Sequence, residues 1–394
     1  MTVLISADRI VTGRAGEVIE RGAVLVSDRQ ITWVGALGAL PERALREADH
    51  RHLEGATLMP GLIEGHAHLC LDGGKDPFGR LHGAGPEEVL TYARDAAETM
   101  ARKGITTVRD MGSVYPVTTV VRTEIASGRL RGPRVLTAGV PLTTPGGHCA
   151  AFGGVVDGEE DMVEHIQANR RDGATWTKLM VTGGFLTSKV SSPYVGQFEA
   201  SLLDAAVALS HELGLKVAAH AHGTAGIRMA VAAGVDTIEH CTWMTESGFD
   251  FAIETAAEIA RQGIGVGLTI NSRARDAKGR LPWRARCEQL IAMRAAGVSF
   301  IACTDCGIGG TPHDDLPASL ISYTDAGYTP IEVIEMATSG NARMLGIGDI
   351  TGSLAAGSMA DLLAVDGDPL VDLAHLSRTR LVMVEGAVIP SGRP

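Results

Sequence analysis

Two histidines, His66 and His68, are separated by one residue and lie shortly after the apolar run LMPGLI at residues 58–63. On a β-strand, side chains two residues apart point to the same face, so both imidazoles can aim at one point. Neutral imidazole is a common metal ligand. The pair therefore indicates half of a metal site, although His-X-His pairs also occur on protein surfaces without any metal.

Four further candidate ligands follow downstream, and each closes a predicted strand: Lys178, His220, His240 and Asp305. Lys178 is an isolated charge inside the apolar run 176–181 (WTKLMV). Taken singly, a histidine at a strand end is more often a hydrogen-bonded core residue, and a buried lysine can pair with an acid. Four such residues at corresponding strand ends favour one shared site.

The elements that must position these residues alternate between short apolar strands and helical stretches, which is typical of βα units and a parallel sheet. Helices are predicted for residues 86–103, 199–213 and 282–296. Eight strands are predicted to end near His68, Asp110, Gly139, Val181, His220, His240, Ile270 and Asp305. No Gly-X-Gly-X-X-Gly fingerprint opens a helix. We therefore predict an α/β fold, a (β/α)8 TIM barrel over residues 58–349, whose strand carboxyl ends carry the chemistry.

Both ends of the chain differ from this pattern. Residues 3–12 and 23–34 alternate apolar and polar side chains, as half-buried antiparallel strands do, and residues 360–365 and 381–386 are also strand-like. Neither end has enough strands for a stable sheet of its own. Residues 1–57 and 350–394 are therefore predicted to form one composite β-sandwich domain.

The composition limits the class of protein. The 394 residues carry a net charge of −11, which argues against non-specific nucleic-acid binding. The first residues lack the basic and apolar regions of a signal peptide, and no run of about 18 apolar residues predicts a membrane span. The six scattered cysteines are typical of reduced thiols, so we expect a cytoplasmic protein that acts on a small molecule.

At this point the sequence resembles the amidohydrolase superfamily over nearly its whole length. The matching residues are 59–63 (MPGLI), His66, His68, Lys178, His220, His240, Asp305 and the tail segment 352–362. Within the superfamily, the chain is most similar to the imidazolonepropionase-like and Xaa-Pro dipeptidase (prolidase-like) group. That resemblance implies a binuclear centre of two divalent metal ions, zinc first and manganese, cobalt or iron as alternatives, bridged by a carboxylated lysine and a hydroxide.

The implied ligand set places His66, His68 and Asp305 on one metal. It places His220 and His240 on the other metal, with Lys178 bridging the two. Simple physics agrees with this role for Lys178, because an ammonium repels a cation whereas a carbamate offers it anionic oxygens. The mononuclear deaminases of the superfamily typically carry a glutamate soon after the fifth-strand histidine. This chain has His222 and Gly223 there, which disfavours deamination.

Two more histidines are candidate site residues. His220 and His222 share one strand face, so spacing alone cannot say which is the ligand; the family pattern favours His220 and leaves His222 facing the substrate. His148 ends the loop segment 145–148 (PGGH), where glycines let the backbone approach a ligand closely. The resemblance implies that His148 stabilises an oxyanion, the alternative being a loop histidine in water.

Two loops are predicted to shape the pocket. Residues 182–198 form a long loop that can act as a lid and carries Tyr194 as a candidate substrate contact. Residues 271–282 are rich in basic side chains, among them Arg273 and Arg275. Solvated charge is the default interpretation of such a cluster, but at this end of a barrel an arginine can clamp a substrate carboxylate.

The function expected from these observations is hydrolysis of a C–N amide-type bond by a metal-activated hydroxide, with Asp305 carrying the proton to the leaving amine. The resemblance favours a dipeptide of Xaa-Pro type or an N-acyl amino acid. Cyclic amides, carbamates, lactones and xenobiotic esters stay open as substrates, because one metal centre serves all these carbonyls. A catalytically silent binding relative is disfavoured because no ligand is lost, and the superfamily implies a homo-oligomer.

Overall fold

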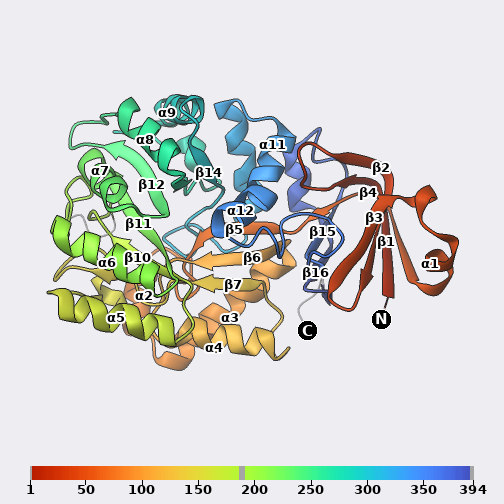
Figure 1. Ribbon diagram of the computed structural model, residues 1–394, viewed down its shortest axis with the longest axis horizontal. Helices are drawn as coiled ribbons and strands as arrows, with labels where there is room; N and C mark the ends of the chain where they lie inside the picture. Colours follow the sequence, from red (N-terminus) through yellow and green to blue (C-terminus); the bar gives the residue numbers. More distant parts are fainter. Residues whose placement is uncertain (1, 186–190, 391–394) are drawn as a thin grey trace.

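The computed structural model describes residues 2–185 and 191–390, and most of them form a barrel beside a smaller β-domain (Figure 1). Among the described residues, the barrel consists of eight parallel strands: β5 (Leu62–Ala67), β6 (Ile105–Asp110), β7 (Arg134–Thr137), β10 (Trp176–Met180), β11 (Lys216–Gly223), β12 (Thr237–Met244), β13 (Gly265–Gly267) and β14 (Ser299–Ile301). Two short strands extend this sheet: β8 (Leu142–Thr143) pairs with β10, and β9 (Gly154–Val155) pairs with β8.

Backbone hydrogen bonds close the barrel at both seams. The Gly65 amide donates to the Ala302 carbonyl at 3.2 Å, and the Thr175 amide donates to the Thr137 carbonyl at 3.0 Å. The predicted barrel is therefore confirmed, and the strand ends that the sequence indicated lie at one end of it.

Helices cover the outside of the barrel because each presents one apolar stripe to the strands. In α3 (Pro86–Arg102) the buried positions Val89, Ala93, Ala97 and Met100 recur every three or four residues. The other long helices are α4 (Val117–Ala126), α5 (Glu159–Arg171), α6 (Ala200–Glu212), α7 (Thr224–Ala233), α8 (Ile253–Gln262) and α9 (Trp283–Ala295). Shorter ones are α1 (Glu42–Glu47), α2 (Pro77–Gly83), α10 (Leu316–Ser319), α11 (Pro330–Glu335) and α12 (Asn341–Leu345). Among the described helices, none is both long and apolar enough to cross a membrane.

The described strands from the two ends of the chain form a seven-stranded sheet in the order β17-β16-β15-β4-β1-β2-β3. These strands are β1 (Thr2–Val11), β2 (Val18–Ser27), β3 (Gln30–Ala36), β4 (Asp49–Pro60), β15 (Leu362–Asp366), β16 (Thr379–Val384) and β17 (Ala387–Ile389). The sheet closes over a core that includes Ile5, Val24 and Leu362 from different strands, which confirms the small β-sandwich built from both termini.

Two details of this β-domain differ from the prediction. Residues 23–34 are not one strand, because the chain turns at Asp28 (φ 56°) between β2 and β3. Aspartate tolerates this left-handed conformation, so the turn needs no glycine and left no glycine signal in the sequence. The pairing is also mixed rather than purely antiparallel, since β1 and β4 run parallel.

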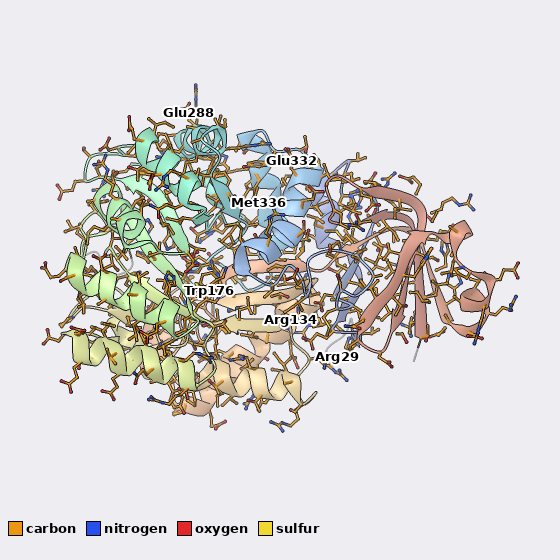
Figure 2. The ribbon with its side chains drawn as sticks, viewed as in Figure 1. Arg29, Arg134, Trp176, Glu288, Glu332 and Met336 are labelled. Atoms are coloured by element: carbon orange, nitrogen blue, oxygen red, sulfur yellow. The ribbon has the colours of Figure 1, made fainter. Side chains whose placement is uncertain are left out.

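The β-domain is joined to the barrel by continuous chain and by charge pairs of Arg134. Strand β4 spans the predicted boundary at residues 57 and 58 and leads directly into β5. Arg134, on β7, binds Asp361 and Glu385 of the β-domain at 2.8 and 2.9 Å, and Arg29 also pairs with Glu385. Figure 2 shows Arg29 and Arg134 close together where the two parts meet.

Candidate metal centre

The carboxyl ends of β5 and β14 bring together the first group of possible metal ligands. His66 lies near the end of β5, His68 follows that strand, and Asp305 follows β14. Asp305 Oδ1 lies 3.4 Å from His66 Nε2 and 3.3 Å from His68 Nε2. The Asp305 backbone has φ 61°, a strained conformation for a non-glycine residue that is typical of functional sites. The three side chains can hold one metal ion.

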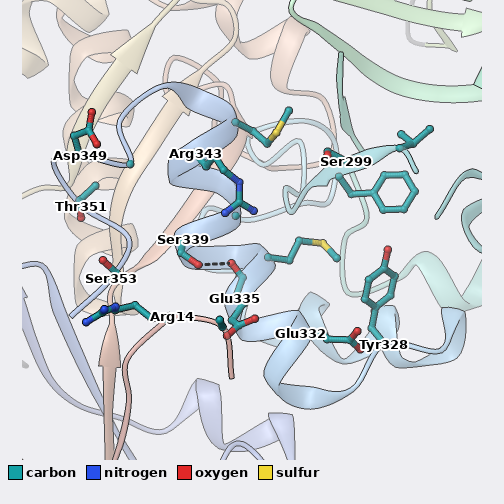
Figure 3. Close-up of a pocket in the computed structure, with 18 residues that line it drawn as sticks. Arg14, Ser299, Tyr328, Glu332, Glu335, Ser339, Arg343, Asp349, Thr351 and Ser353 are labelled. Atoms are coloured by element: carbon teal, nitrogen blue, oxygen red, sulfur yellow. Dashed lines mark hydrogen bonds between the residues drawn. The ribbon is translucent and has the colours of Figure 1, made fainter. Parts of the chain in front are cut away.

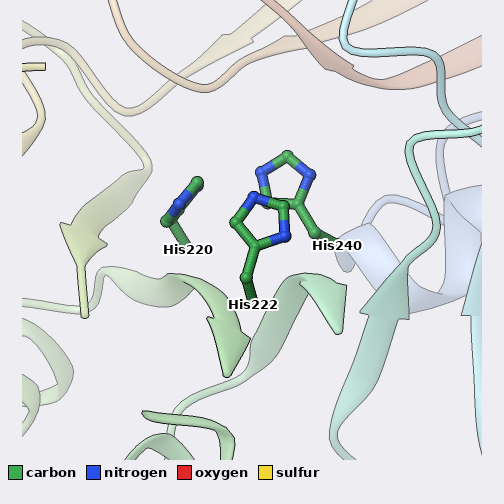
Figure 4. Close-up of side chains that lie close together, drawn as sticks. All are labelled: His220, His222 and His240. Carbon is green, nitrogen blue, oxygen red and sulfur yellow. The ribbon is translucent and has the colours of Figure 1, made fainter. Parts of the chain in front are cut away.

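A second group lies beside the first, on β11 and β12. His220, His222 and His240 offer nitrogens within 4.8 Å of one another, and Figure 4 shows the three rings converging on one space. The ring centroids of His220 and His240 are 4.5 Å apart, as are those of His222 and His240. His240 and His66 link the two groups at a centroid distance of 5.5 Å. The structure therefore brings both predicted ligand groups into one site.

Hydrogen bonds leave one ring nitrogen available on each of the first-group histidines. His66 Nδ1 donates to Glu239 Oε2 at 2.9 Å, and His68 Nδ1 donates to the Gly112 carbonyl at 2.8 Å. Both therefore present Nε2 to the site. Such partners fix the tautomer and the orientation of a metal-binding imidazole.

The histidines of the second group differ in which ring nitrogen forms a hydrogen bond with a neighbouring residue. His220 Nε2 donates to the Gly183 carbonyl at 3.1 Å, which leaves Nδ1 toward the site. His240 and His222 use Nδ1 with the hydroxyls of Thr269 and Thr242, at 2.9 and 3.0 Å. The geometry thus places His222 in one group with His220 and His240. Which of His220 and His222 is the ligand stays a prediction.

Burial keeps most of these rings neutral, which is the form that binds metals. Burial, followed by Lys178, lowers the pKa of His66 to about 4, and burial followed by His148 lowers the pKa of His222 to about 3. His68 differs: burial lowers its pKa, but the adjacent Asp305 carboxylate outweighs burial and raises it. Burial also raises the pKa of Asp305, yet His66 and His68 outweigh it and leave a pKa of about 2.

Lys178 lies buried on β10 among these groups, and its Nζ has no hydrogen-bond partner among the described residues. Asp305 Oδ1 is also buried without a hydrogen-bond partner in the same part of the chain. Burial lowers the pKa of Lys178, against the opposing charges of Glu239 and Asp305. Unsatisfied buried polar atoms are costly, so a lysine nitrogen and a carboxylate left in this state fit a site completed by cations and by carboxylation of the lysine.

Beneath the histidines lies a buried ion pair that the sequence analysis did not identify. Arg109 and Glu239 are both fully buried, and Arg109 Nη2 donates to Glu239 Oε1 at 2.8 Å. The Arg109 guanidinium also lies over the Trp176 ring, 4.6 Å from its centroid. Glu239 in turn holds His66, so the pair connects the barrel interior to the proposed ligand. Each is a charged residue inside a barrel strand, next to Asp110 in β6 or His240 in β12, and this position is a signal that the sequence does contain.

A cavity of about 240 Å³ opens onto both ligand groups. His148 lines it, with its ring centroid 4.5 Å from that of His220, so the structure places this predicted residue at the site. Its backbone amide donates to Gln197 Oε1 at 2.9 Å. Burial and then Lys178 lower the pKa of His148 to about 4, so the ring is neutral near pH 7.

The other predicted substrate contacts lie farther out. Arg275 forms a two-point ion pair with Asp325 at 2.7 and 2.8 Å, and Arg273 Nη2 donates to the Gly309 carbonyl at 3.1 Å. Tyr194 pairs with Arg280. Among the described residues that line the cavity, none is Tyr194, Arg273 or Arg275, so substrate contact by these three stays a prediction. Residues 186–190 of the predicted lid lie outside the described residues.

A larger cavity of about 690 Å³ lies away from the histidines, where the β1–β2 turn meets α11 and α12 (Figure 3). Its walls carry Arg14, Glu335 and Arg343, and Ser339 donates to the Glu335 carbonyl at 3.5 Å. The described lining residues include none of the proposed ligands. Size alone therefore does not mark the active site.

The six cysteines, all within the described residues, are free and buried. Cys70, Cys149, Cys241 and Cys306 belong to the main hydrophobic core. Cys149 also lines the cavity, but burial raises the pKa of its thiol, which disfavours a nucleophilic thiolate.

A parallel barrel with two histidine groups, an aspartate and a buried lysine at its carboxyl end defines a metal-dependent barrel hydrolase. The chain belongs to the amidohydrolase family, whose model matches residues 57–389. The match confirms the resemblance seen in the sequence, and the protein is a hydrolase that acts on carbon–nitrogen bonds.

Three relatives illustrate the similarity. Ochratoxinase from Aspergillus niger is 27% identical over 409 aligned positions, covering 93% of this chain and 82% of that protein. Imidazolonepropionase from Salinispora tropica is 26% identical over 94% of this chain and 93% of that protein. The crystal structure of a Xaa-Pro dipeptidase with methionine in its active site superposes with a TM-score of 0.86 at 26% identity, covering 98% of this chain and 99% of that one.

Proposed function

We propose that this protein is a binuclear amidohydrolase that cleaves the C–N bond of a dipeptide, of Xaa-Pro type, or of an N-acyl amino acid. The observation that carries the proposal is the buried Lys178 nitrogen, without a hydrogen-bond partner among the described residues and surrounded by two groups of possible ligands. The similarity to a Xaa-Pro dipeptidase and to an ochratoxinase supports the same kind of bond.

In this proposal His66, His68 and Asp305 would hold one ion and His220 and His240 the other, and Lys178, once carboxylated, would be a ligand shared by both. Zinc is the leading candidate, and manganese, cobalt or iron are alternatives. When bound, such ions lower the pKa of water and polarise a carbonyl. Cytoplasmic location and homo-oligomeric assembly stay predictions.

The chain's own residues then have distinct tasks. The Asp305 carboxylate accepts a proton from the attacking water and passes it to the leaving amine. His148, neutral at pH 7 and lining the cavity, donates a hydrogen bond to the developing oxyanion. His222, with Nδ1 held by Thr242, presents Nε2 toward the substrate.

The proposal predicts release of a free amino acid from dipeptides or N-acyl amino acids. The protein would be loaded with zinc or manganese in bicarbonate buffer, and amino acid and ammonia would be measured separately. Amino acid release supports the proposal and ranks the substrates. Ammonia without amino acid would indicate a deaminase instead. Neither product, with two metal ions bound per chain, would redirect the search to cyclic amides, carbamates and esters.

Metal content distinguishes His220 from His222. His220→Asn is expected to lower the metal content of the purified protein from two ions toward one, because it removes Nδ1 from the ligand set. His222→Asn is expected to retain both ions and to change KM instead. Elemental analysis of both variants, purified in parallel, provides the measurement. The reverse pattern would make His222 the ligand.

A further inference from the structure

The cavity is lined by apolar side chains as well as by the proposed ligands. Besides the proposed ligands, the described lining includes two phenylalanines, a methionine and an isoleucine: Phe78, Phe185, Met180 and Ile308. These side chains come from four different segments of the chain, and no single motif in the sequence marks them. Together they form a surface that neither the ligand set nor the proposed proton transfers require.

One wall is an aromatic stack behind a proposed ligand. Phe152 stacks on His68 with ring centroids 5.8 Å apart and an angle of 19° between the planes. Phe78, in α2, packs on Phe152 at a centroid distance of 5.6 Å. Because Phe152 is buried and anchored on both sides, this stack holds Phe78 at the cavity.

A second aromatic part of the lining is Phe185, in the segment after β10. Its ring meets the His222 ring edge to face, with centroids 4.8 Å apart at 68°, and it contacts Tyr194 at 6.2 Å. Phe185 nevertheless keeps 45% of its surface exposed. An aromatic ring that lines a cavity and stays half exposed gains free energy when an apolar group covers it.

The remaining polar lining carries no permanent charge. Outside the proposed ligands, the described polar residues of the cavity are Thr269, Asn271, Thr304, His148 and His222. Apart from the proposed ligands Lys178 and Asp305, no described lining residue offers an opposite charge to a charged substrate side chain, so burying such a side chain here costs desolvation energy.

We propose that the cavity binds an apolar and preferably aromatic side chain next to the scissile amide, and that Phe185 determines this specificity. The inference rests on the proposed function and names its substrate class: N-acyl amino acids or dipeptides whose side chain is of phenylalanine or leucine type. Phe185 contacts the substrate side chain, and Phe78 lines the same space.

The test uses two substrate series with phenylalanine, leucine, alanine, aspartate or lysine as the variable residue. In N-acetyl amino acids this residue leaves as the amine, and in Xaa-Pro dipeptides it provides the acyl group. In at least one series, kcat/KM is expected to be about 10- to 100-fold higher for phenylalanine than for alanine, and lowest for aspartate and lysine.

Phe185→Ala is expected to reduce the ratio of kcat/KM for phenylalanine over alanine by about tenfold. The matched control is Phe249→Ala, because the exposed fraction of Phe249, 42%, is similar to that of Phe185, but Phe249 is not among the residues that line the cavity. The control ratio should equal that of the parent protein. An equal change in both variants, or a parent protein without any apolar preference, would overturn the inference while leaving the proposed function intact.

If no turnover occurs, measurement of ligand binding still tests the apolar cavity separately from the proposed hydrolysis. Calorimetric titration of the metal-loaded protein with N-acetylphenylalanine and N-acetylalanine measures the same preference without hydrolysis. Tighter binding of the phenylalanine compound that is lost in Phe185→Ala supports the apolar cavity even in a protein that cleaves neither series. Equal binding of both compounds contradicts it.

Discussion

Replacing Asp305 with asparagine is expected to abolish turnover while metal binding is largely retained. The amide oxygen of asparagine keeps one donor atom near His66 and His68, which lie 3.4 and 3.3 Å from Asp305 Oδ1. An amide, however, has no basic oxygen that can accept a proton from water near neutral pH. Loss of positioned general acid–base catalysis typically costs about 10²- to 10⁴-fold in rate, so kcat should fall by at least about 100-fold.

The measurement combines steady-state kinetics with metal analysis of the same preparation. Asp315→Asn is the matched control, because Asp315 is also a buried carboxylate near this end of the barrel but binds Ser272 and does not line the cavity. The control should retain most of the activity. Substantial turnover by Asp305→Asn with both metals bound would refute its role in proton transfer.

The barrel could be predicted because each βα unit leaves a local record in the sequence. Parallel strands covered on both faces are continuous apolar runs, and α3 repeats its buried positions at helical spacing. Polar residues that interrupt this pattern at strand ends, such as His66 and Asp305, are conspicuous for the same reason. Their convergence then follows from the rule that the carboxyl ends of barrel strands meet at one face.

The remaining features depend on contacts that no local pattern encodes. The turn at Asp28 uses a residue that only tolerates its conformation, so one predicted strand became two. Arg275 was a candidate clamp because of its position after β13, yet it pairs with Asp325, fifty positions farther along the chain. Phe78 and Phe185 are single aromatic residues whose approach to the cavity is fixed by tertiary packing alone.

Replacing Arg109 with methionine is expected to destabilise the protein severely. Arg109 and Glu239 have no solvent exposure, so the substitution leaves a carboxylate buried without its charge partner. Breaking a buried pair in this way typically costs about 3–5 kcal/mol. Burial by itself raises the pKa of Glu239, and Arg109 and His66 are the groups that outweigh it and hold this pKa below its usual range. Denaturant unfolding of the metal-free protein measures the loss.

The double variant Arg109→Met, Glu239→Gln separates the ion pair from the packing of its side chains. Because no charge is then left buried, the double variant should be more stable than Arg109→Met alone. An equal loss of stability in both would show that packing against Trp176, rather than charge, makes Arg109 important.

Glu239→Gln by itself should weaken metal binding in addition to the fold, which loses stability because Arg109 is left buried without its charge partner. The glutamine amide cannot draw the His66 Nδ1 proton as the carboxylate does, and loss of such a partner typically lowers metal affinity by about 10- to 100-fold. Glu64→Gln is the control, because Glu64 is equally buried but accepts hydrogen bonds from the His66 backbone and from Thr304 rather than from a ring. Burial raises the pKa of Glu64 to about 8, so at pH 7 the substitution changes little charge. Competition with a chelator should therefore separate the two variants, and equal metal affinity in both would mean that Glu239 supports the barrel rather than the orientation of His66.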